Sequence, residues 1–233
     1  MAAAVDADRA GRVPWSADWT VAACAQHVGG AHHVVAGVIE GRPTADFGLF
    51  SSLAIPGVAD PGLGAWLSGG TAALVGQLRA AAGDAECWSW WPEGHTANFW
   101  RRRMAHETLV HRWDAELGAG IVGDPMEPTL AADGIDEYLD VIVGMTRVLH
   151  SAPVGPPVGL RCTDTDGEWL LDLSAPGERR ARRGESRGDV TLVGPAEGLL
   201  LWVWGRLESD TGGVTAVGDR TVLDNWTELV PPL

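Results

Sequence analysis

A segment rich in proline and glycine divides this chain into two halves that differ in hydrophobic periodicity. The segment covers Ser151–Pro157 and reads SAPVGPP. Before it, apolar residues recur at helical spacing over long stretches, whereas after it short apolar runs alternate with turn residues. We therefore predict a two-domain α+β protein with domains at residues 1–152 and 153–233.

The first domain is predicted to be a four-helix bundle, because long amphipathic stretches joined by workable connections are typical of that architecture. Ser16 or Asp18 is expected to cap the first helix, which stops near Gly41. The other three helices are expected at about residues 63–82, 96–118 and 130–149, and residues 43–62 are expected to form a loop.

The second domain is predicted to be a small α/β domain. The expected strands are Val158–Cys162, Glu168–Leu173, Glu178–Arg183, Asp189–Val193 and Val214–Val217. A helix is expected over Pro195–Leu207, with proline in its first turn, and a last helix is expected from Asp219 onward.

The charge of the chain excludes two classes of partner. It has 17 Lys and Arg against 31 Asp and Glu, a formal net charge of −14. Binding to nucleic acid or to an anionic membrane surface needs a positive surface, so we expect neither partner.

The sequence favours a cytoplasmic location. The N-terminal segment has no apolar core of a signal peptide, and no stretch of about 18 apolar residues is long enough to span a membrane. The cysteines Cys24, Cys87 and Cys162 lie far apart and form no C-x-x-C pair. A disulfide framework or a cysteine-based zinc site is therefore not expected, and a reducing compartment fits better.

The segment Trp100–Gly118 places two metal-ligand side chains on one helix face. Glu107 and His111 lie four residues apart, so on a helix they stack one turn from each other, on a stripe whose other large members are apolar. A buried carboxylate is costly without a partner, and a divalent metal removes that cost. Asp114, three residues beyond His111, could orient its imidazole.

Three other interpretations of this segment remain open. A Glu-x-x-x-His pair also occurs by chance on solvated faces, and His106 lies on a more apolar stripe than Glu107 does. In the third, the bundle holds no metal and Glu107 pairs with an arginine such as Arg103 or Arg112.

His27, on the apolar stripe of the first helix, could complete the site. With Glu107 and His111 it would supply two imidazoles and one carboxylate, the open three-ligand arrangement of a catalytic zinc. A single histidine on an apolar face is more often a core residue. His32 and His33 are alternatives, to which we assign either an interfacial role or a role in supporting a ligand, with no direct contact to the metal. Cys24 is expected to be a buried apolar filler.

Two sets of arginines could bind an anionic substrate. The run of residues 179–187 holds five arginines and is expected to be either a solvated strand edge or an anion-binding surface. Arg206 closes the apolar helix LLLWVWGR and could bind a carboxylate or compensate the helix dipole.

Several of these segments carry a family resemblance. They are Trp19 with His27, HETLVHRWDAELG at residues 106–118, DVTLVGPAEGLLLWVWGR at residues 189–206, and GDRTVLDNW at residues 218–226. Together they span nearly the whole chain. In this combination the chain resembles the mycothiol-dependent maleylpyruvate isomerase family, which belongs to the DinB-like group of metal-binding four-helix bundles.

The resemblance implies a DinB-like bundle with its metal ligands at His27, Glu107 and His111, followed by a smaller domain that carries a functional arginine. Arg206 is our choice for that arginine, and Arg220 is the alternative. The implied cofactors are a divalent metal, preferably zinc, and mycothiol as cosubstrate. All 17 basic residues are arginine, which fits a GC-rich, actinobacterial source.

The function implied by the resemblance is a thiol S-transferase or a thiol-assisted cis-trans isomerase. The expected partners are a small electrophile, which could be anionic, and a low-molecular-weight thiol. The alternative is a non-catalytic metal-binding or stress-response protein with the same bundle.

Overall fold

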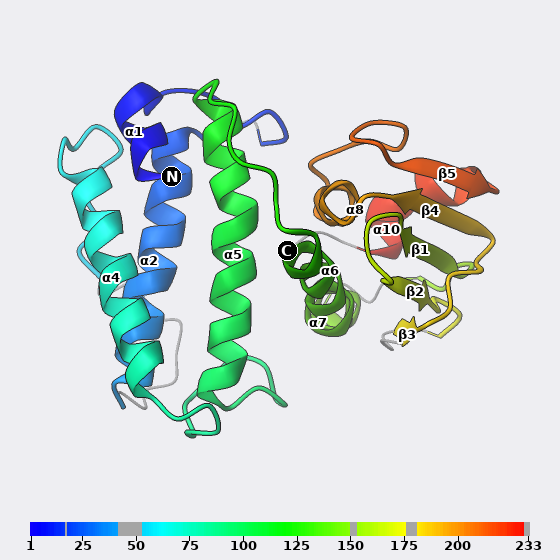
Figure 1. Ribbon diagram of the computed structural model, residues 1–233, viewed down its shortest axis with the longest axis horizontal. Helices are drawn as coiled ribbons and strands as arrows, with labels where there is room; N and C mark the ends of the chain where they lie inside the picture. The colour runs from blue at the N-terminus through cyan, green and yellow to red at the C-terminus, as the bar shows by residue number, and fades with distance from the viewer. Residues whose placement is uncertain (17, 42–52, 150–152, 176–180, 231–233) are drawn as a thin grey trace. The chain divides into compact units, whose positions relative to one another are not determined.

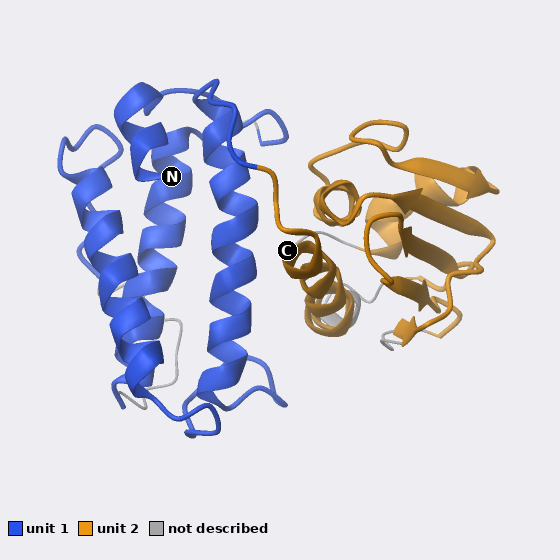
Figure 2. Ribbon diagram, in the orientation of Figure 1, with its two compact units in different colours: residues 1–124 blue, residues 125–233 orange. Residues whose placement is uncertain are grey.

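The computed structural model describes residues 1–16, 18–41, 53–149, 153–175 and 181–230. The chain divides into two compact units, and each is considered by itself (Figure 2). Unit 1, Met1–Asp124, is a helical bundle, and unit 2, Pro125–Leu233, contains a five-stranded sheet with helices. The predicted two-domain α+β class is confirmed.

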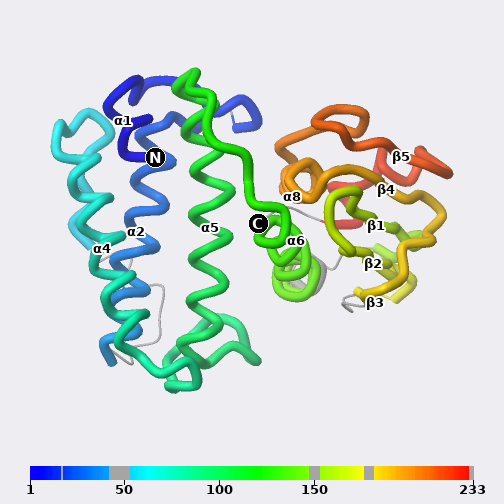
Figure 3. Tube along the Cα trace, viewed as in Figure 1, coloured from blue at the N-terminus to red at the C-terminus, as the bar shows by residue number. Residues whose placement is uncertain are grey.

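The described residues of unit 1 form three long helices. They are preceded by one short helix, and the elements are α1 (Ala2–Asp8), α2 (Val21–Ile39), α4 (Leu63–Ala80) and α5 (Ala97–Gly118). Helix α2 lies between α4 and α5 and packs against both (Figure 3). The three long helices were predicted, whereas the short helix α1 was not.

Helix α2 approaches α4 closely because it is rich in small residues. A Cβ atom at Gly29 would lie 2.3 Å from the Trp66 ring of α4, so only glycine fits there without a shift. The helix is capped by Thr20, whose hydroxyl accepts a hydrogen bond from the Ala23 N–H at 3.2 Å. The expectation that Ser16 or Asp18 caps this helix was wrong, because the chain enters the helix only after Thr20.

The helix expected at residues 130–149 belongs to unit 2. It forms as α6 (Pro128–Glu137), a π-helical stretch η1 (Tyr138–Val143) and α7 (Gly144–Leu149), and α6 packs against α8 (Ala196–Val203). Contacts divide the chain between Asp124 and Pro125, ahead of the boundary expected at 152/153. Residues 150–152 lie outside the described part of the chain.

The sheet of unit 2 is mixed, with strand order β3-β2-β1-β4-β5. Its strands are β1 (Val158–Cys162), β2 (Glu168–Leu171), β3 (Ala181–Arg183), β4 (Val190–Gly194) and β5 (Thr215–Gly218). The two central strands, β1 and β4, run parallel with Leu160 opposite Leu192, and all other pairs are antiparallel. Helix α8 packs against both central strands (Figure 1).

The predicted helices of the second half form, but with different bounds. Helix α8 is shorter than the expected helix over Pro195–Leu207, and the last helix forms as two short turns, α9 (Thr221–Asp224) and α10 (Trp226–Leu229). Residues 178–180 of the strand expected at Glu178–Arg183 lie outside the described residues, and the rest of it forms β3. Within the part that the structure describes, no helix is both long and apolar enough to cross a bilayer.

Candidate metal centre

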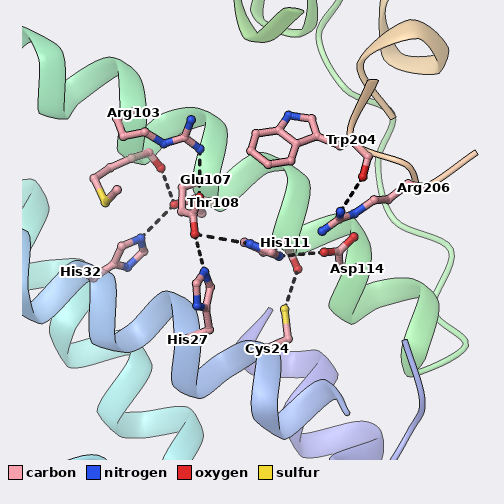
Figure 4. A network of polar contacts seen from close by, with 11 residues as sticks. Cys24, His27, His32, Arg103, Glu107, Thr108, His111, Asp114, Trp204 and Arg206 are labelled. Carbon is pink, nitrogen blue, oxygen red and sulfur yellow. Dashed lines mark hydrogen bonds and ion pairs between the residues drawn. The ribbon is translucent and has the colours of Figure 1, made fainter. Parts of the chain in front are cut away.

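Three side chains of unit 1 converge between α2 and α5. His27 comes from α2, and Glu107 and His111 come from consecutive turns of α5 (Figure 4). Glu107 Oε1 lies 2.7 Å from His27 Nε2 and 3.4 Å from His111 Nε2. The structure therefore brings the three sequence-predicted ligands together, across 80 residues of chain.

The cluster is buried on the α5 side and open on the α2 side. The side chains of Glu107 and His111 are 14% and 10% exposed, whereas that of His27 is 44% exposed. A small molecule could therefore reach the cluster past His27. An accessible ligand set of this kind is typical of a catalytic rather than a structural metal site.

A buried carboxylate holds the second nitrogen of His111. Asp114 is fully buried, and its Oδ2 lies 2.7 Å from His111 Nδ1. With Nδ1 hydrogen-bonded to Asp114, Nε2 is the nitrogen that faces Glu107. This is the arrangement by which a carboxylate orients a metal-binding imidazole, as predicted for Asp114.

Glu107 and His111 each stabilise the charged form of the other. Burial by itself would raise the pKa of Glu107, but hydrogen bonds with His111 and His27 and the positive charge of Arg103 outweigh it and hold that pKa well below its ordinary value. Burial would lower the pKa of His111, yet hydrogen bonds with Asp114, Cys24 and Glu107 raise that pKa well above its ordinary value. The raised pKa favours the protonated form of His111 when no metal is bound, and a metal that binds there would displace that proton.

The donor set fits a divalent metal. The ligand atoms of His27, Glu107 and His111 all lie within 4.8 Å of one another. Two imidazole nitrogens and one carboxylate oxygen form a set that zinc accepts with a coordination position left open, and nickel or iron also suits it.

A second group of possible ligands shares His111. Cys24, His111 and Asp114 also have ligand atoms within 4.8 Å of one another, and all three are buried. Burial raises the pKa of the Cys24 thiol, and its Sγ donates to the His111 carbonyl at 3.4 Å. Because a metal binds the thiolate and not the thiol, the group with His27 and Glu107 fits a metal better.

Glu107 also pairs with an arginine. Its second oxygen, Oε2, accepts a hydrogen bond from Arg103 Nη2 at 2.9 Å. Arg112, the other arginine considered, lies near Glu116 instead, with Nε 3.7 Å from Oε2. The carboxylate thus faces an arginine with one oxygen and two imidazoles with the other.

The remaining histidines of these helices lie outside the cluster. His32 is buried and places its ring nitrogens 2.9 Å from the hydroxyls of Thr71 and Thr108. His33 stacks on Trp66 at 4.7 Å between ring centroids, and His106 is buried elsewhere on α5. These contacts agree with the interfacial role expected for His32 and His33.

Trp19 covers both imidazoles and was not predicted as part of the site. Its ring stacks on His111 with centroids 5.5 Å apart and lies 5.1 Å from the His27 ring. The only sign of this role in the sequence is its position eight residues before His27. The ring supplies an apolar wall beside the two imidazoles.

The candidate arginines lie in unit 2. Arg206 lies three residues beyond the end of α8, and its Nη1 donates to the Trp204 carbonyl at 2.6 Å. Arg220 forms an ion pair with Asp210 on the surface. Both arginines therefore contact a protein partner.

Two described arginines of the basic run, Arg182 and Arg183, form ion pairs. Arg182 lies within 4.0 Å of Asp172 and Glu185, and Arg183 pairs with Asp136 and Asp140 of α6 and η1. Arg179 and Arg180 lie outside the described residues. These pairs agree better with a strand edge tied to neighbouring carboxylates than with an open anion-binding surface.

Comparison with known families covers nearly the whole chain. The profile of the family described as "Mycothiol maleylpyruvate isomerase N-terminal domain" matches residues 1–116. The profile described as "MDMPI C-terminal domain" matches residues 129–225. No curated protein matches the chain.

Proposed function

The chain belongs to the mycothiol maleylpyruvate isomerase family, and from this premise we propose that it is a metal-dependent enzyme that uses a low-molecular-weight thiol, mycothiol, to attack a small electrophile. The single observation that supports this most is the convergence of His27, Glu107 and His111 within 4.8 Å, on the side of α2 where His27 is open to solvent. We propose zinc as the metal.

The protein's own residues have separate roles in this proposal. His27, Glu107 and His111 would hold the ion, and Asp114 would keep Nε2 of His111 turned toward it. A divalent ion held there would deprotonate a coordinated thiol at neutral pH. Trp19 would keep water from one side of the imidazoles.

Arg206 is proposed as the residue that binds the electrophile's carboxylate. Its guanidinium would stabilise the negative charge that develops as the thiolate forms a carbon–sulfur bond to the electrophile. In transfer, a leaving group would depart with its electron pair and the thioether would remain. In isomerisation, the adduct would rotate about the former double bond. The carbon–sulfur bond would then break as the double bond re-forms, and sulfur would leave with its electron pair as the thiolate.

The reducing cytoplasm is the proposed location, since a free thiol cosubstrate persists there. The three cysteines of the chain, Cys24, Cys87 and Cys162, are all free in the structure. An oxidising compartment would convert the cosubstrate to its disulfide.

Metal removal combined with thiol assays tests this function. We expect protein purified without chelators to hold about one divalent ion per chain, and a chelator to abolish reaction of mycothiol with maleylpyruvate or a second electrophile. Elemental analysis measures the metal, chromatography measures isomer formation, and mass spectrometry measures the thioether. Zinc added back should restore the activity.

Two outcomes would contradict the proposal. Activity that survives complete metal removal unchanged would show that the metal is not needed. Metal binding without any thiol-dependent turnover would favour the non-catalytic metal-binding or stress-response alternative.

Replacing Arg206 with alanine is expected to lower kcat/KM for a carboxylate-bearing electrophile by roughly 10–100-fold, the size of a lost hydrogen bond to a charged group. The loss should be much smaller for a neutral electrophile. Arg220→Ala is the matched control, because it removes the same charge from a residue already paired with Asp210. If Arg220→Ala shows the loss and Arg206→Ala does not, the assignment is reversed.

A further inference from the structure

Arg103 stands in line with the proposed ligands on one face of α5. Arg103, Glu107 and His111 follow one another at intervals of four residues, so their side chains succeed one another turn by turn. Arg103 is itself 3% exposed, and its Nη2 lies 2.9 Å from Glu107 Oε2 (Figure 4). Because its side chain is buried, the Arg103 guanidinium would have to break its contact with Glu107 to become hydrated.

The two oxygens of Glu107 are divided between different partners. Oε2 faces Arg103, whereas Oε1 faces His27 at 2.7 Å and His111 at 3.4 Å. The oxygen on the Arg103 side is already engaged in a charge-assisted hydrogen bond, which is stronger and more directional than a neutral one. Only the other oxygen is directed at the imidazoles.

We propose that Arg103 is a positioning residue that makes Glu107 a one-oxygen ligand. This inference rests on the proposed function, because it assigns a role toward the metal held by His27, Glu107 and His111. By holding Oε2, Arg103 prevents the carboxylate from binding through both oxygens. A coordination position that a second oxygen would fill is thereby kept for the thiol.

The pairing also affects the charge of the site. Arg103 offsets the negative charge of Glu107, and two neutral imidazoles add none, so of the described acidic groups at the cluster only the Asp114 carboxylate behind His111 is left to oppose a bound cation. A divalent ion held there would therefore keep a net positive charge, which would favour the thiolate form of a bound thiol and attract anionic substrates. Because the pair is buried, salt screens this effect less than it would at the surface.

A second pair on the same helix provides a matched control. Arg112 and Glu116 also lie four residues apart on α5, with Arg112 Nε 3.7 Å from Glu116 Oε2. Neither residue belongs to the ligand cluster. Arg112→Leu therefore removes a guanidinium from the same helix at the same spacing, from a residue that contacts Glu116 and the Asp124 carbonyl rather than Glu107.

The test is Co²⁺ binding to the full chain after metal removal, measured by calorimetry and by visible absorption. Arg103→Leu is expected to bind Co²⁺ 10–100-fold more weakly than the unchanged protein, as is typical when a residue that orients a metal ligand is lost. Its visible absorption should also weaken, because four-coordinate Co²⁺ absorbs more strongly than five- or six-coordinate Co²⁺ and two-oxygen binding raises the coordination number.

Two conservative variants accompany the leucine variant. Arg103→Lys keeps the charge and a donor, and should recover most of the affinity and of the absorption. Arg103→Gln keeps a hydrogen-bond donor without the charge. If Arg103→Leu does not fold, the Co²⁺ affinity and absorption of Arg103→Gln are compared with those of the unchanged protein instead. The melting temperature of each metal-free variant separates a folding defect from a binding defect.

Each outcome decides the role of Arg103. The positioning role is supported if Arg103→Leu binds Co²⁺ more weakly and absorbs less than the unchanged protein, while Arg112→Leu shows neither change. Unchanged or tighter Co²⁺ binding in Arg103→Leu overturns it, since removal of a positive charge would then outweigh any loss of orientation. An equal loss in both variants also overturns it. If the unchanged protein binds no Co²⁺, the proposed function fails first and this role fails with it.

Discussion

Replacing His111 with alanine is expected to abolish stoichiometric zinc binding together with thiol-dependent activity. The variant removes one of three ligands, and it also removes the hydrogen bond between His111 and the buried Asp114. Two remaining ligands would bind zinc too weakly to survive purification. Elemental analysis of the purified variant, and its reaction rate with mycothiol in added zinc, measure both losses.

His27→Ala separates ligation from folding. The His27 side chain is 44% exposed and that of His111 is 10% exposed, so His27→Ala should lower the metal-free melting temperature less than His111→Ala does, while it abolishes zinc binding as fully. His33→Ala is the control on the same helix, because His33 stacks on Trp66 and lies outside the ligand group. Stoichiometric zinc in both His27→Ala and His111→Ala would show that the metal lies elsewhere.

The second large effect expected is a loss of stability on mild acidification that depends on His32. Burial lowers the pKa of His32 from an ordinary 6.5 to about 4; the negative charge of Glu107 opposes this shift, and His33 adds to it. The ring is 2% exposed and contacts hydroxyls of Thr71 and Thr108. A proton on this imidazole would place a charge in the bundle interior.

The direction of the effect follows from the two pKa values. Between pH 6.5 and about 4, the unfolded chain binds a proton at residue 32 and the folded protein does not, so the free energy of unfolding falls as the pH falls. Above pH 6.5 both states are neutral at this residue and nothing is lost. The full loss is about 3 kcal/mol, of which about 2 kcal/mol should be present at pH 5.

Urea unfolding of the metal-free protein and of His32→Gln at pH 7 and pH 5 measures this loss. The variant lacks the titrating ring and keeps every other group, so the difference in unfolding free energy between the two proteins should shrink by about 2 kcal/mol. An NMR titration of the His32 ring provides an independent measurement. A midpoint near 6.5, or a difference that does not change with pH, would contradict the prediction.

The three long helices of unit 1 could be predicted because their signals are local. Apolar spacing, Thr96 at the start of α5 and the glycine-rich connections each depend on a few neighbouring residues. The cap of α2 was missed because Ser16, Asp18 and Thr20 are all good caps, and only the path of the chain selects Thr20. The short helix α1 carries no strong periodic signal.

The membership of the helix at residues 128–149 could not be predicted from its spacing. Its apolar stripe is compatible with packing in a bundle or against a sheet, and contacts with α8 assign it to unit 2. The strands were predicted more accurately than this helix, because each is a short apolar run bounded by turn residues, and this pattern marks the second half of the chain.

The sequence by itself determined that Glu107 and His111 share one face of α5, with Arg103 one turn before and Asp114 just beyond. That order follows from 3.6 residues per turn and needs no other helix. Only the tertiary structure decided that His27, and not His32 or His33, meets Glu107, and that Trp19 covers both rings. The packing of α2 on α4, where Gly29 lies against the Trp66 ring, joins residues far apart in the chain, so the spacing within α2 alone does not determine which of its faces meets α5.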